Sequence, residues 1–437
     1  MPEPTERFDA IIIGVGQAAS ALANRLSTAG MTVAIIERKL VGGTCVNVGC
    51  TPTKAMVASA RVARLAARAG EYGVTIPGAP AVDMAAVNDR TGAIVAKSRS
   101  GLEQWIEGLA GCRLIRGHAR FESVRTVRVG ARMLEADKIF INVGARASAS
   151  NIAGLEEVDW LSSSGMVTLR ELPRHLVVIG GSYIGLEFAQ MFRRFGAQVT
   201  VVERGPRLMP REDREVSDEI RAILEAEGVV FKVDAECIEV RAHPDGVAVL
   251  THGGKEQTVG SHVLVAAGRV PNTDDLGLHE AGVRTDAHGY IEVDGRLATN
   301  VPGIWALGDC NGRGAFTHTA YNDYEIVAAN LLDGEPRSVD ERIPVYALYI
   351  DPPLGRVGLS EEQALAQGRA VRVGKRAMTR VGRAVEKGEA QGSMRIVADA
   401  HTDEILGAAI LGPGGDEAVH MVLAAMAGGM SCKQLTR

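Results

Sequence analysis

The sequence has few aromatic residues, few cysteines and no long apolar run. Of its 437 residues, 4% are aromatic and six are cysteine. Six cysteines are too few to cross-link a chain of this length, so a disulfide scaffold is excluded. No run approaches the roughly 18 apolar residues of a membrane helix, and the first residues lack the layout of a secretory signal. We therefore expect a cytoplasmic protein with no membrane partner.

A strong charge of either sign is also missing. The formal net charge is −5, which argues against a protein that binds the phosphate backbone of nucleic acids. Hydrophobic residues make up 46% of the chain, enough to exclude disorder as the main state. At about 150 residues per domain, the length predicts roughly three domains. Glycine is abundant, with 51 residues and no repeat, which indicates many tight turns.

The chain contains one pattern twice: a buried strand, a Gly-rich turn, a helix and a second strand that ends in an acid. The strands and helix are expected at residues 8–13, 20–29 and 32–36 in the first copy, and at 176–179, 186–195 and 199–202 in the second. Gly14 to Glu37 and Gly180 to Glu203 both span 23 positions. Two units of equal length are hard to obtain by chance, so the sequence predicts two dinucleotide-binding units.

The first turn fits the pattern G-x-G-x-x-G/A with Gly14, Gly16 and Ala19. Such a turn lets the backbone approach a pyrophosphate and aims a helix N-terminus at its negative charge. Glu37 would accept hydrogen bonds from a ribose hydroxyl. A purely structural turn is the alternative.

The second turn departs from this pattern, because Ser182 stands where the middle glycine would be. Its Cβ would hinder the closest approach of a pyrophosphate, although the context and the spacing to Glu203 still favour a nucleotide site over a structural turn. Glu203 favours NADH, since a carboxylate repels the 2′-phosphate of NADPH. Three basic residues that could accommodate this phosphate follow, namely Arg204, Arg207 and Arg211. NADPH is therefore the alternative.

The most specific segment, residues 42–54, holds Cys45 and Cys50 just before a helix expected at 54–70. A helix N-terminus and Lys54 would both lower the pKa of a nearby thiol, so we expect a reactive thiolate at Cys50. The alternatives are a metal site and two buried free thiols. Because companion His or Cys ligands at zinc spacing are missing, we expect a redox-active disulfide and no metal. Three arginines of the expected helix would form a solvated face, namely Arg61, Arg64 and Arg68.

These motifs together resemble the class I pyridine nucleotide–disulfide oxidoreductases, FAD-dependent enzymes that include glutathione reductase, dihydrolipoamide dehydrogenase and mercuric reductase. Residues 42–54 resemble the redox-disulfide signature of the family and look most like the mercuric-reductase-like branch. Further resemblances are the NAD(P) turn at 180–187, the return to the flavin domain at 267–272, the second FAD segment at 299–309 and the dimerisation domain at 340–420. The resemblance covers nearly the whole chain.

The resemblance implies an α/β fold with two Rossmann-like dinucleotide-binding domains, for FAD and NAD(P), and an α+β dimerisation domain. Residues 1–150 and 272–338 would form the FAD domain, 151–271 the NAD(P) domain and 339–437 an incomplete dimerisation domain. The expected enzyme is a homodimer that passes electrons from NAD(P)H through FAD to the Cys45–Cys50 disulfide. The final acceptor would be a small disulfide, a metal ion or an oxidant.

The resemblance also implies roles for the residues around the disulfide. Cys50 would be the charge-transfer thiol against the flavin, and Cys45 the interchange thiol that faces the substrate. Lys54 would lie near the reactive flavin nitrogen and pair with Glu187, the alternative being a surface ion pair. Tyr183 would cover the flavin and move aside for the nicotinamide, the alternative being a core tyrosine.

Further cofactor contacts follow from the same resemblance. The FAD residues would be Gly14, Gly16, Ala19, Glu37, Gly43, Thr44, Gly49, Lys54, Ala119, Gly144, Arg269, Gly308, Asp309, Phe316 and Thr317. The NAD(P) residues would be Gly180, Gly181, Ser182, Tyr183, Ile184, Gly185, Glu203, Arg204 and Gly268. Among these, Asp309 would accept hydrogen bonds from the ribityl chain. The other cysteines are expected to be structural, namely Cys112, Cys237, Cys310 and Cys432.

The sequence departs from the family at its end. The family closes with His-Pro-Thr followed by Glu, and this histidine acts across the dimer interface as the acid–base partner of the interchange thiol. Here the sequence stops at Arg437, just before this motif would begin, and His420 does not match it. Two explanations are open: a truncated version of a longer enzyme, or a natural variant, which includes an impaired flavoprotein that acts as a redox sensor. Dihydrolipoamide dehydrogenase or mercuric reductase activity is a further alternative.

Overall fold

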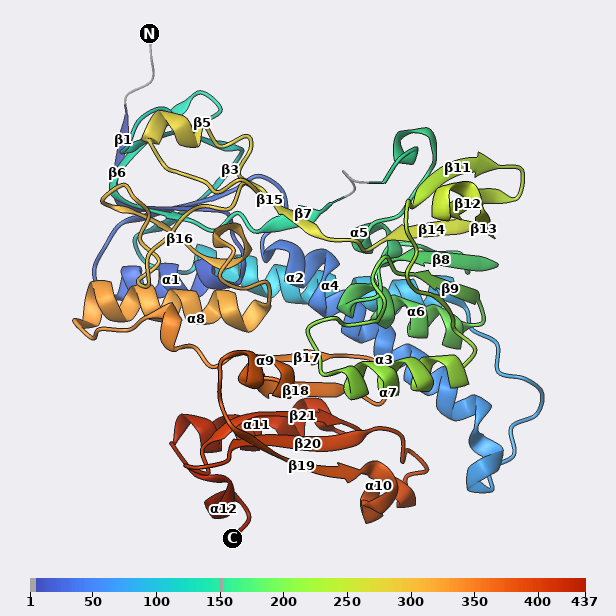
Figure 1. The fold of residues 1–437 in the computed structure, drawn as a ribbon. Helices are drawn as coiled ribbons and strands as arrows, with labels where there is room; N and C mark the ends of the chain where they lie inside the picture. The colour runs from blue at the N-terminus through green and yellow to red at the C-terminus, as the bar shows by residue number, and fades with distance from the viewer. Residues whose placement is uncertain (1–4, 149–151) are drawn as a thin grey trace. The chain divides into compact units, whose positions relative to one another are not determined.

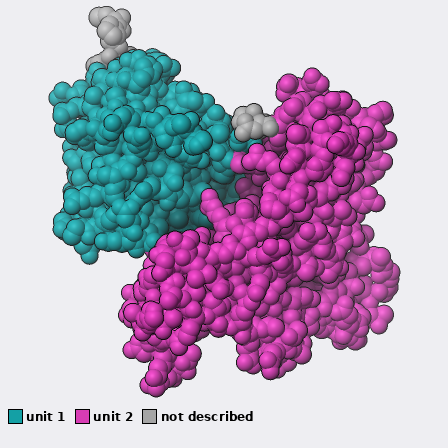
Figure 2. Space-filling view, in the orientation of Figure 1, with its two compact units in different colours: residues 1–53, 90–148, 269–342 teal, residues 54–89, 149–268, 343–437 magenta. Residues whose placement is uncertain are grey.

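The computed structural model describes residues 5–148 and 152–437 and has a mixed α/β fold (Figure 1). The chain divides into two compact units, which Figure 2 colours separately. Unit 1 comprises residues 1–53, 90–148 and 269–342, and unit 2 comprises 54–89, 149–268 and 343–437. Residues 54–89, expected in the first domain, thus cluster with unit 2. The expected boundary at 150/151 lies outside the described residues.

Unit 1 contains a seven-stranded sheet with the order β3-β2-β1-β6-β5-β4, in which β16 pairs with β6. Its strands are β1 (Glu6–Ile13), β2 (Val33–Glu37), β3 (Cys112–Arg116), β4 (Ala119–Phe121), β5 (Thr126–Val129), β6 (Arg132–Ile141) and β16 (Ile304–Ala306). The strands β1, β2, β3, β6 and β16 run parallel, whereas β4, β5 and β6 pair antiparallel. The strands expected at 8–13 and 32–36 are confirmed.

Both faces of this sheet are covered, which is why β1 is apolar without alternation. Ile11 and Ile13 pack into a cluster on one face, and Ala10 and Ile12 pack on the other face. The second face carries α1 (Gln17–Thr28), which lies beside α8 (Thr317–Ala328). A two-stranded ribbon of β7 (Ala145–Ala147) and β15 (Arg269–Pro271) completes unit 1.

Three helices follow the second strand in the chain. They are α2 (Gly43–Val48), α3 (Cys50–Ala67) and α4 (Met84–Glu107). The prediction that the helix after the cysteines begins at residue 54 is wrong, because α3 begins at Cys50. Pro52 permits this earlier start, since the first amides of a helix need no partner within it. The bond from the Thr53 N–H to the Gly49 carbonyl, at 3.0 Å, closes this first turn.

Unit 2 contains a parallel sheet in the order β10-β9-β8-β14. The strands are β8 (His175–Ile179), β9 (Gln198–Val202), β10 (Val230–Lys232) and β14 (His262–Val265), with the helices α5 (Ser163–Met166), α6 (Tyr183–Phe195) and α7 (Arg214–Ala226). An antiparallel sheet follows, of β11 (Glu239–His243), β12 (Gly246–Thr251) and β13 (Glu256–Gly260). The second strand–turn–helix–strand copy is confirmed, and its helix begins at Tyr183, before the expected start.

The C-terminal part of unit 2 is an antiparallel sheet in the order β17-β18-β21-β20-β19 with helices against it. The elements are β17 (Val345–Leu348), β18 (Leu354–Gly358), α9 (Glu361–Ala366), β19 (Val371–Ala377), α10 (Gly382–Glu386), β20 (Ser393–Asp399), β21 (Ile405–Leu411), α11 (Gly415–Ala427) and α12 (Cys432–Leu435). This is the expected α+β layout. None of the helices in the described part of the chain is both long and apolar enough to span a bilayer.

Candidate active site

The two cysteines of the expected disulfide lie on either side of a break between two helices. Cys45 lies within α2, and Cys50 is the first residue of α3. Both were expected just before the helix; Cys45 does precede α3, although it lies in a short helix of its own, and Cys50 is instead part of α3. Gly49 separates the helices, and a Cβ at this position would lie 2.9 Å from the Thr44 carbonyl oxygen. Glycine thus permits the close approach that brings the second cysteine back toward the first.

One hydroxyl group contacts both sulfur atoms. Thr317, the first residue of α8, donates to Sγ of Cys45 at 3.2 Å, and its Oγ1 lies 3.1 Å from Sγ of Cys50. Neither of these two cysteines is in a disulfide bond in this structure, and Cys50 is exposed while Cys45 is half-buried. The structure thus shows a dithiol whose two sulfurs converge on the Thr317 hydroxyl.

The electrostatics of the pair are asymmetric. The pKa of the Cys45 thiol is raised above its ordinary value, first by a hydrogen bond with Cys50, then by burial and by the charge of Cys50. The hydrogen bond from Thr317 acts in the opposite direction and lowers this pKa. Cys45 therefore keeps its proton and can donate it to a thiolate at Cys50. That Cys50 carries the thiolate stays a prediction.

Lys54 and Glu187, the expected ion pair, are in contact. Nζ of Lys54 lies 3.2 and 2.9 Å from the two carboxylate oxygens of Glu187 on α6. The Glu187 side chain is 7% exposed and that of Lys54 is 34% exposed. The backbone N–H of Tyr349 donates to Oε1 of Glu187 at 2.9 Å, and the Tyr349 ring centroid lies 4.3 Å from Nζ of Lys54. Tyr349 joins the pair, although the sequence analysis did not single it out.

The first Gly-rich turn is tight and ends at a fixed carboxylate. Gly14 has a φ of +91°, and a Cβ there would lie 2.5 Å from the Asn142 carbonyl oxygen. Oε2 of Glu37 accepts from the Val15 N–H at 2.9 Å, and Oε1 accepts from the Lys39 N–H at 2.7 Å. Gly16, the N-cap of α1, provides no side-chain cap. The helix N-terminus is therefore open to an anion.

The second Gly-rich turn is built in the same way. Gly180 has a φ of +118°, and a Cβ there would lie 2.6 Å from the Ala266 carbonyl oxygen. Oε2 of Glu203 accepts from the Gly181 N–H at 2.6 Å, and Oε1 accepts from the Gly205 N–H at 2.8 Å. Ser182 is the N-cap of α6 and makes no capping hydrogen bond. Its hydroxyl lies against the sulfur of Met209, 3.7 Å away.

The arginines after Glu203 differ in their availability. Arg207 forms a bidentate ion pair with Glu362, with distances of 3.0 and 2.9 Å. Arg204 and Arg211 are exposed. Arg211 also interacts with Tyr183, where its charge and its hydrogen bond oppose the rise in the Tyr183 pKa that burial causes. Arg204 and Arg211 are thus accessible to a 2′-phosphate, whereas Arg207 is engaged with Glu362.

Unit 1 holds further residues that the sequence assigned to FAD. Nη2 of Arg269 lies 3.0 Å from Oδ2 of Asp309 and donates to the Ala145 carbonyl at 2.7 Å. Burial raises the pKa of Asp309, and the charge of Arg269 opposes this rise. Ala119 is buried in β4, and the Phe316 ring stacks on His318 with centroids 5.5 Å apart. The turns at Gly43, Gly144 and Gly308 all have positive φ angles, of +59°, +65° and +73°.

Two buried polar residues at these turns were missed. Asn142 is 6% exposed, and its side chain lies next to Gly16 and Gly308, where added Cβ atoms would be 3.0 and 3.1 Å from it. Asp323 is 2% exposed and accepts from the Gly308 N–H at 2.7 Å. Asn142 follows β6 directly, and polar residues at the carboxyl ends of parallel strands are a signal that could have identified it.

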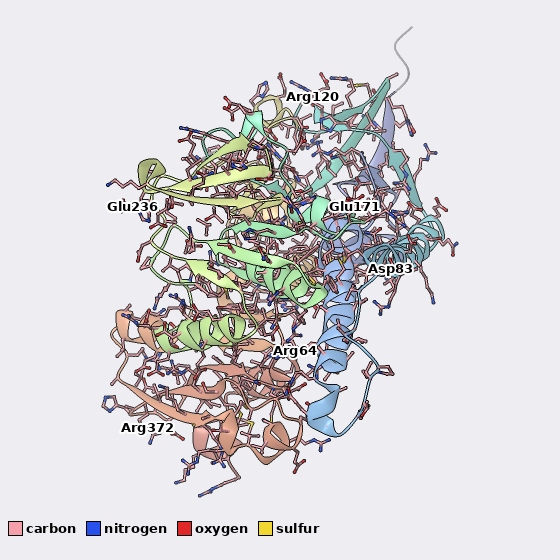
Figure 3. The ribbon with its side chains drawn as sticks, turned by 90° about the vertical axis from the view of Figure 1, so that its right-hand side faces the viewer. Arg64, Asp83, Arg120, Glu171, Glu236 and Arg372 are labelled. Atoms are coloured by element: carbon pink, nitrogen blue, oxygen red, sulfur yellow. The ribbon has the colours of Figure 1, made fainter. Side chains whose placement is uncertain are left out.

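The arginines expected on a solvated helix face are instead engaged, so this prediction is wrong. Arg61 forms ion pairs with Asp351 and with Glu389, the second at 2.7 Å. Arg64, labelled in Figure 3, lies 4.0 Å from Glu227. These partners are remote in sequence, so the helical pattern alone gave no sign of them.

The residues present fit a bound dinucleotide in both units. Each unit combines a turn in which a Cβ would clash, a helix N-terminus without a side-chain cap and an acid at the end of the second strand. These are the features that hold a pyrophosphate and a ribose. Across residues 5–148 and 152–437, no group of three or more His, Cys, Asp or Glu side chains could hold a metal ion.

Comparison with protein families gives two matches that together span most of the chain. Residues 8–323 match the model described as pyridine nucleotide-disulphide oxidoreductase. Residues 345–437 match the dimerisation domain of the same family.

Individual relatives have related but different names. A probable pyridine nucleotide-disulfide oxidoreductase, RclA, from Escherichia coli (strain K12) is 34% identical over 97% of this chain and 93% of its own length. A mercuric reductase from Streptomyces lividans is 33% identical over 98% and 92%. Among solved structures, the HOCl-induced flavoprotein disulfide reductase RclA from Escherichia coli matches with a TM-score of 0.89 and 34% identity, over 97% of this chain and 94% of the other.

Proposed function

Since the chain belongs to the pyridine nucleotide-disulphide oxidoreductase family, we propose that it passes electrons from NADH through FAD to a Cys45–Cys50 disulfide and on to a small thiophilic acceptor. It is an FAD-dependent enzyme of a family that binds FAD and a pyridine nucleotide. The dimerisation-domain match supports a homodimer. In our proposal the FAD domain comprises residues 1–150 and 272–338, the NAD(P) domain 151–271 and the dimerisation domain 339–437. A cytoplasmic location stays a prediction.

The observation that carries this proposal is the convergence of both sulfurs on the Thr317 hydroxyl, at 3.2 and 3.1 Å. Two thiols that share a single hydrogen-bonding group are close enough to act as a pair. When bound, FAD supplies two-electron transfer between a nicotinamide and a thiol pair. NADH, one proton and the disulfide become NAD⁺ and the dithiol, and the dithiol returns to the disulfide when it gives two electrons to the acceptor and two protons to solvent.

The residues of this chain have distinct tasks in this cycle. Cys50 carries the thiolate, and Cys45, whose pKa is raised, keeps the proton until the acceptor arrives. Lys54 places a positive charge where the site must tolerate negative charge, and Glu187 holds the ammonium in position. Tyr183, at the start of α6, admits the nicotinamide.

For the acceptor, a soft metal ion is our first candidate. Thiolates are the preferred ligands of soft metals, and an adjacent dithiol can bind such ions and deliver two electrons, either both to one Hg(II), which becomes Hg(0), or one each to two Cu(II), which become Cu(I). Relatives of this chain support the choice by their names: the Streptomyces lividans protein is a mercuric reductase, and one RclA structure is described as a Cu(II) complex. A small disulfide is the second candidate, because a dihydrolipoyl dehydrogenase from Thermus scotoductus is 33% identical.

The test is an anaerobic titration of the purified protein with NADH, followed by addition of acceptors. We expect long-wavelength charge-transfer absorbance after one equivalent of NADH, and its absence in Cys50→Ser. Cu(II), Hg(II), lipoamide and glutathione disulfide are then added separately, and reoxidation is measured.

The matched controls are Cys45→Ser, which should abolish reoxidation by the acceptor, and Cys237→Ser, which removes another exposed thiol and should change nothing. Charge-transfer absorbance that persists in Cys50→Ser would overturn the disulfide relay. Faster turnover of lipoamide than of either metal ion would replace the first acceptor with the second.

A further inference from the structure

Tyr349 contacts both residues of the Lys54–Glu187 ion pair, Glu187 through its backbone and Lys54 through its aromatic ring. Its backbone N–H donates to Oε1 of Glu187 at 2.9 Å. The ammonium of Lys54 lies over the face of the Tyr349 ring, with Nζ 4.3 Å from the ring centroid. This distance is well within the range of a cation–π interaction. The ammonium is therefore held by a carboxylate and an aromatic ring together.

The backbone around Tyr349 is fixed by α6, so its ring has a defined position. Tyr349 follows β17 directly, and two residues later the Asp351 N–H donates to Oε1 of Gln190 at 2.7 Å. Nε2 of Gln190 donates back to the Asp351 carbonyl at 2.8 Å. Glu187 and Gln190 are three positions apart on α6 and share one face of that helix. The same helix face thus binds the ion pair and the segment that carries Tyr349.

Helix α3 holds the same segment from its own side. Arg61, seven positions after Lys54 and so on the same face of α3, forms an ion pair with the Asp351 carboxylate. The second oxygen of Asp351 pairs with Nη1 of Arg194 on α6 at 2.6 Å. The Asp351 side chain is only 14% exposed, and that of Arg194 is 5% exposed. Residues 349–351 are therefore held in place by ion pairs of Asp351 with Arg61 on α3 and with Arg194 on α6.

We propose that Tyr349 is a positioning residue of the redox site, whose ring holds the Lys54 ammonium at Glu187 and thereby sets how strongly the site favours reduced flavin. The proposal rests on the proposed function, in which Lys54 opposes negative charge on the reduced cofactor. A lysine side chain has four rotatable bonds and loses much conformational freedom when it is fixed. A ring that already stands in place lowers this cost, because the ammonium needs no reorganisation at the moment of reduction.

The first test is the midpoint potential of the bound flavin in the whole protein, measured by dye equilibration without NADH. Tyr349→Leu removes the ring but keeps the backbone N–H to Glu187. We expect the ratio of reduced to oxidised flavin at a fixed potential to fall by up to about tenfold, which corresponds to about 30 mV. Tyr349→Phe keeps the aromatic ring, so this variant should have the same flavin midpoint potential as wild type. Equal potentials in wild type and Tyr349→Leu would overturn the proposal.

Two controls separate this role from general packing. Tyr72 is another tyrosine of unit 2 whose ring faces a cation, with the Arg68 guanidinium 5.8 Å from its centroid, so Tyr72→Leu should leave the potential unchanged. In a Lys54→Met background, Tyr349→Leu should have no further effect, because the ring acts through the ammonium. An equal fall of the flavin midpoint potential in Tyr349→Phe or in Tyr72→Leu would count against the proposal. The same fall on adding Tyr349→Leu to Lys54→Met would also count against it. If Tyr349→Leu does not fold, Tyr349→Met provides the same comparison.

The potential also distinguishes this inference from the proposed function. A wild-type flavin that NADH does not reduce would overturn the electron path, whereas the comparison of leucine and phenylalanine at position 349 would still decide the role of the ring.

Discussion

Glu37 and Glu203 occupy equivalent positions in the two strand–turn–helix units, and their carboxylates are bound in the same way. In each, one oxygen accepts from the second residue of the Gly-rich turn, at 2.9 Å from Val15 and 2.6 Å from Gly181. The other oxygen accepts from the residue two positions after the acid, at 2.7 and 2.8 Å. Both acids are thus fixed at the end of their strand before any ribose arrives.

The first prediction concerns the nicotinamide cofactor. Glu203 is held after the second strand of its unit, where we propose that the ribose binds, and its negative charge would oppose the 2′-phosphate of NADPH. We expect kcat/KM to be at least about tenfold higher with NADH than with NADPH, which corresponds to about 1.4 kcal/mol. Steady-state kinetics with both cofactors check this. A higher kcat/KM with NADPH would instead assign the phosphate to the exposed Arg204 and Arg211.

The second prediction concerns Lys54. Lys54→Met removes the ammonium from the Glu187 carboxylate, which is 7% exposed and would keep the Tyr349 N–H as a partner. We expect flavin reduction by NADH to slow by about 10–100-fold, because the positive charge that we propose lies near the reduced flavin is lost. Anaerobic stopped-flow absorbance measures this rate.

Arg64→Met is the matched control for Lys54, since it removes another half-exposed cation of α3, one whose partner is Glu227, 4.0 Å away. This control should lower stability but leave the rate of flavin reduction within about twofold. An unchanged rate in Lys54→Met would contradict the role of the ammonium.

The third prediction concerns the hydroxyl that contacts both thiols. Its hydrogen bond lowers the pKa of Cys45, so Thr317→Val should raise this pKa further. In the reduced protein, alkylation of Cys45 by iodoacetamide near neutral pH should then be about tenfold slower, since the thiolate is the reacting form. Thr317→Ser keeps the hydroxyl and should behave as wild type. Equal alkylation rates in the valine and serine variants, read by mass spectrometry, would show that the hydroxyl does not act on Cys45.

The features that were predicted correctly depend on residues that lie close together in the sequence. The two Gly-rich units follow from residues within 23 positions of each other, and strands, helices and turns of this kind carry local signals. The start of α3 was missed for a local reason as well. Pro52 is tolerated anywhere in a first helical turn, so it marks the beginning of a helix without fixing which residue is first.

The features that were missed depend on contacts between distant parts of the chain. Tyr349 reaches Lys54 only because the segment after β17 packs against α6 and α3, and nothing in the residues around position 349 indicates a cation nearby. The same holds for Arg61, whose helical spacing suits a solvated face as well as an ion pair with Asp351. Helical and strand periodicities report which side of an element is polar, but not which partner it will meet.

The last prediction concerns stability against acid in the C-terminal sheet. Oδ1 of Asp399 accepts from the N–H groups of His401 and Thr402, both at 2.9 Å, and Oδ2 accepts from Nε of Arg369 at 2.9 Å. These bonds, the backbone ones first, hold the pKa of Asp399 well below its usual value. Because the folded pKa is the lower one, the ionised carboxylate stabilises the fold above the unfolded value of about 3.9.

This stabilisation is lost as the pH falls through the window below the unfolded value. Asp399→Asn should therefore lower the urea midpoint at pH 7, and the gap to wild type should narrow between pH 4 and pH 3, where the unfolded state takes up a proton first. Asp137→Asn is the control, because its ion pair with Arg125 is exposed, with side chains 70% and 66% accessible, and it should change the midpoint little at any pH. A gap that stays constant from pH 7 to pH 3 would mean that Asp399 stabilises the turn by its shape and not by its charge.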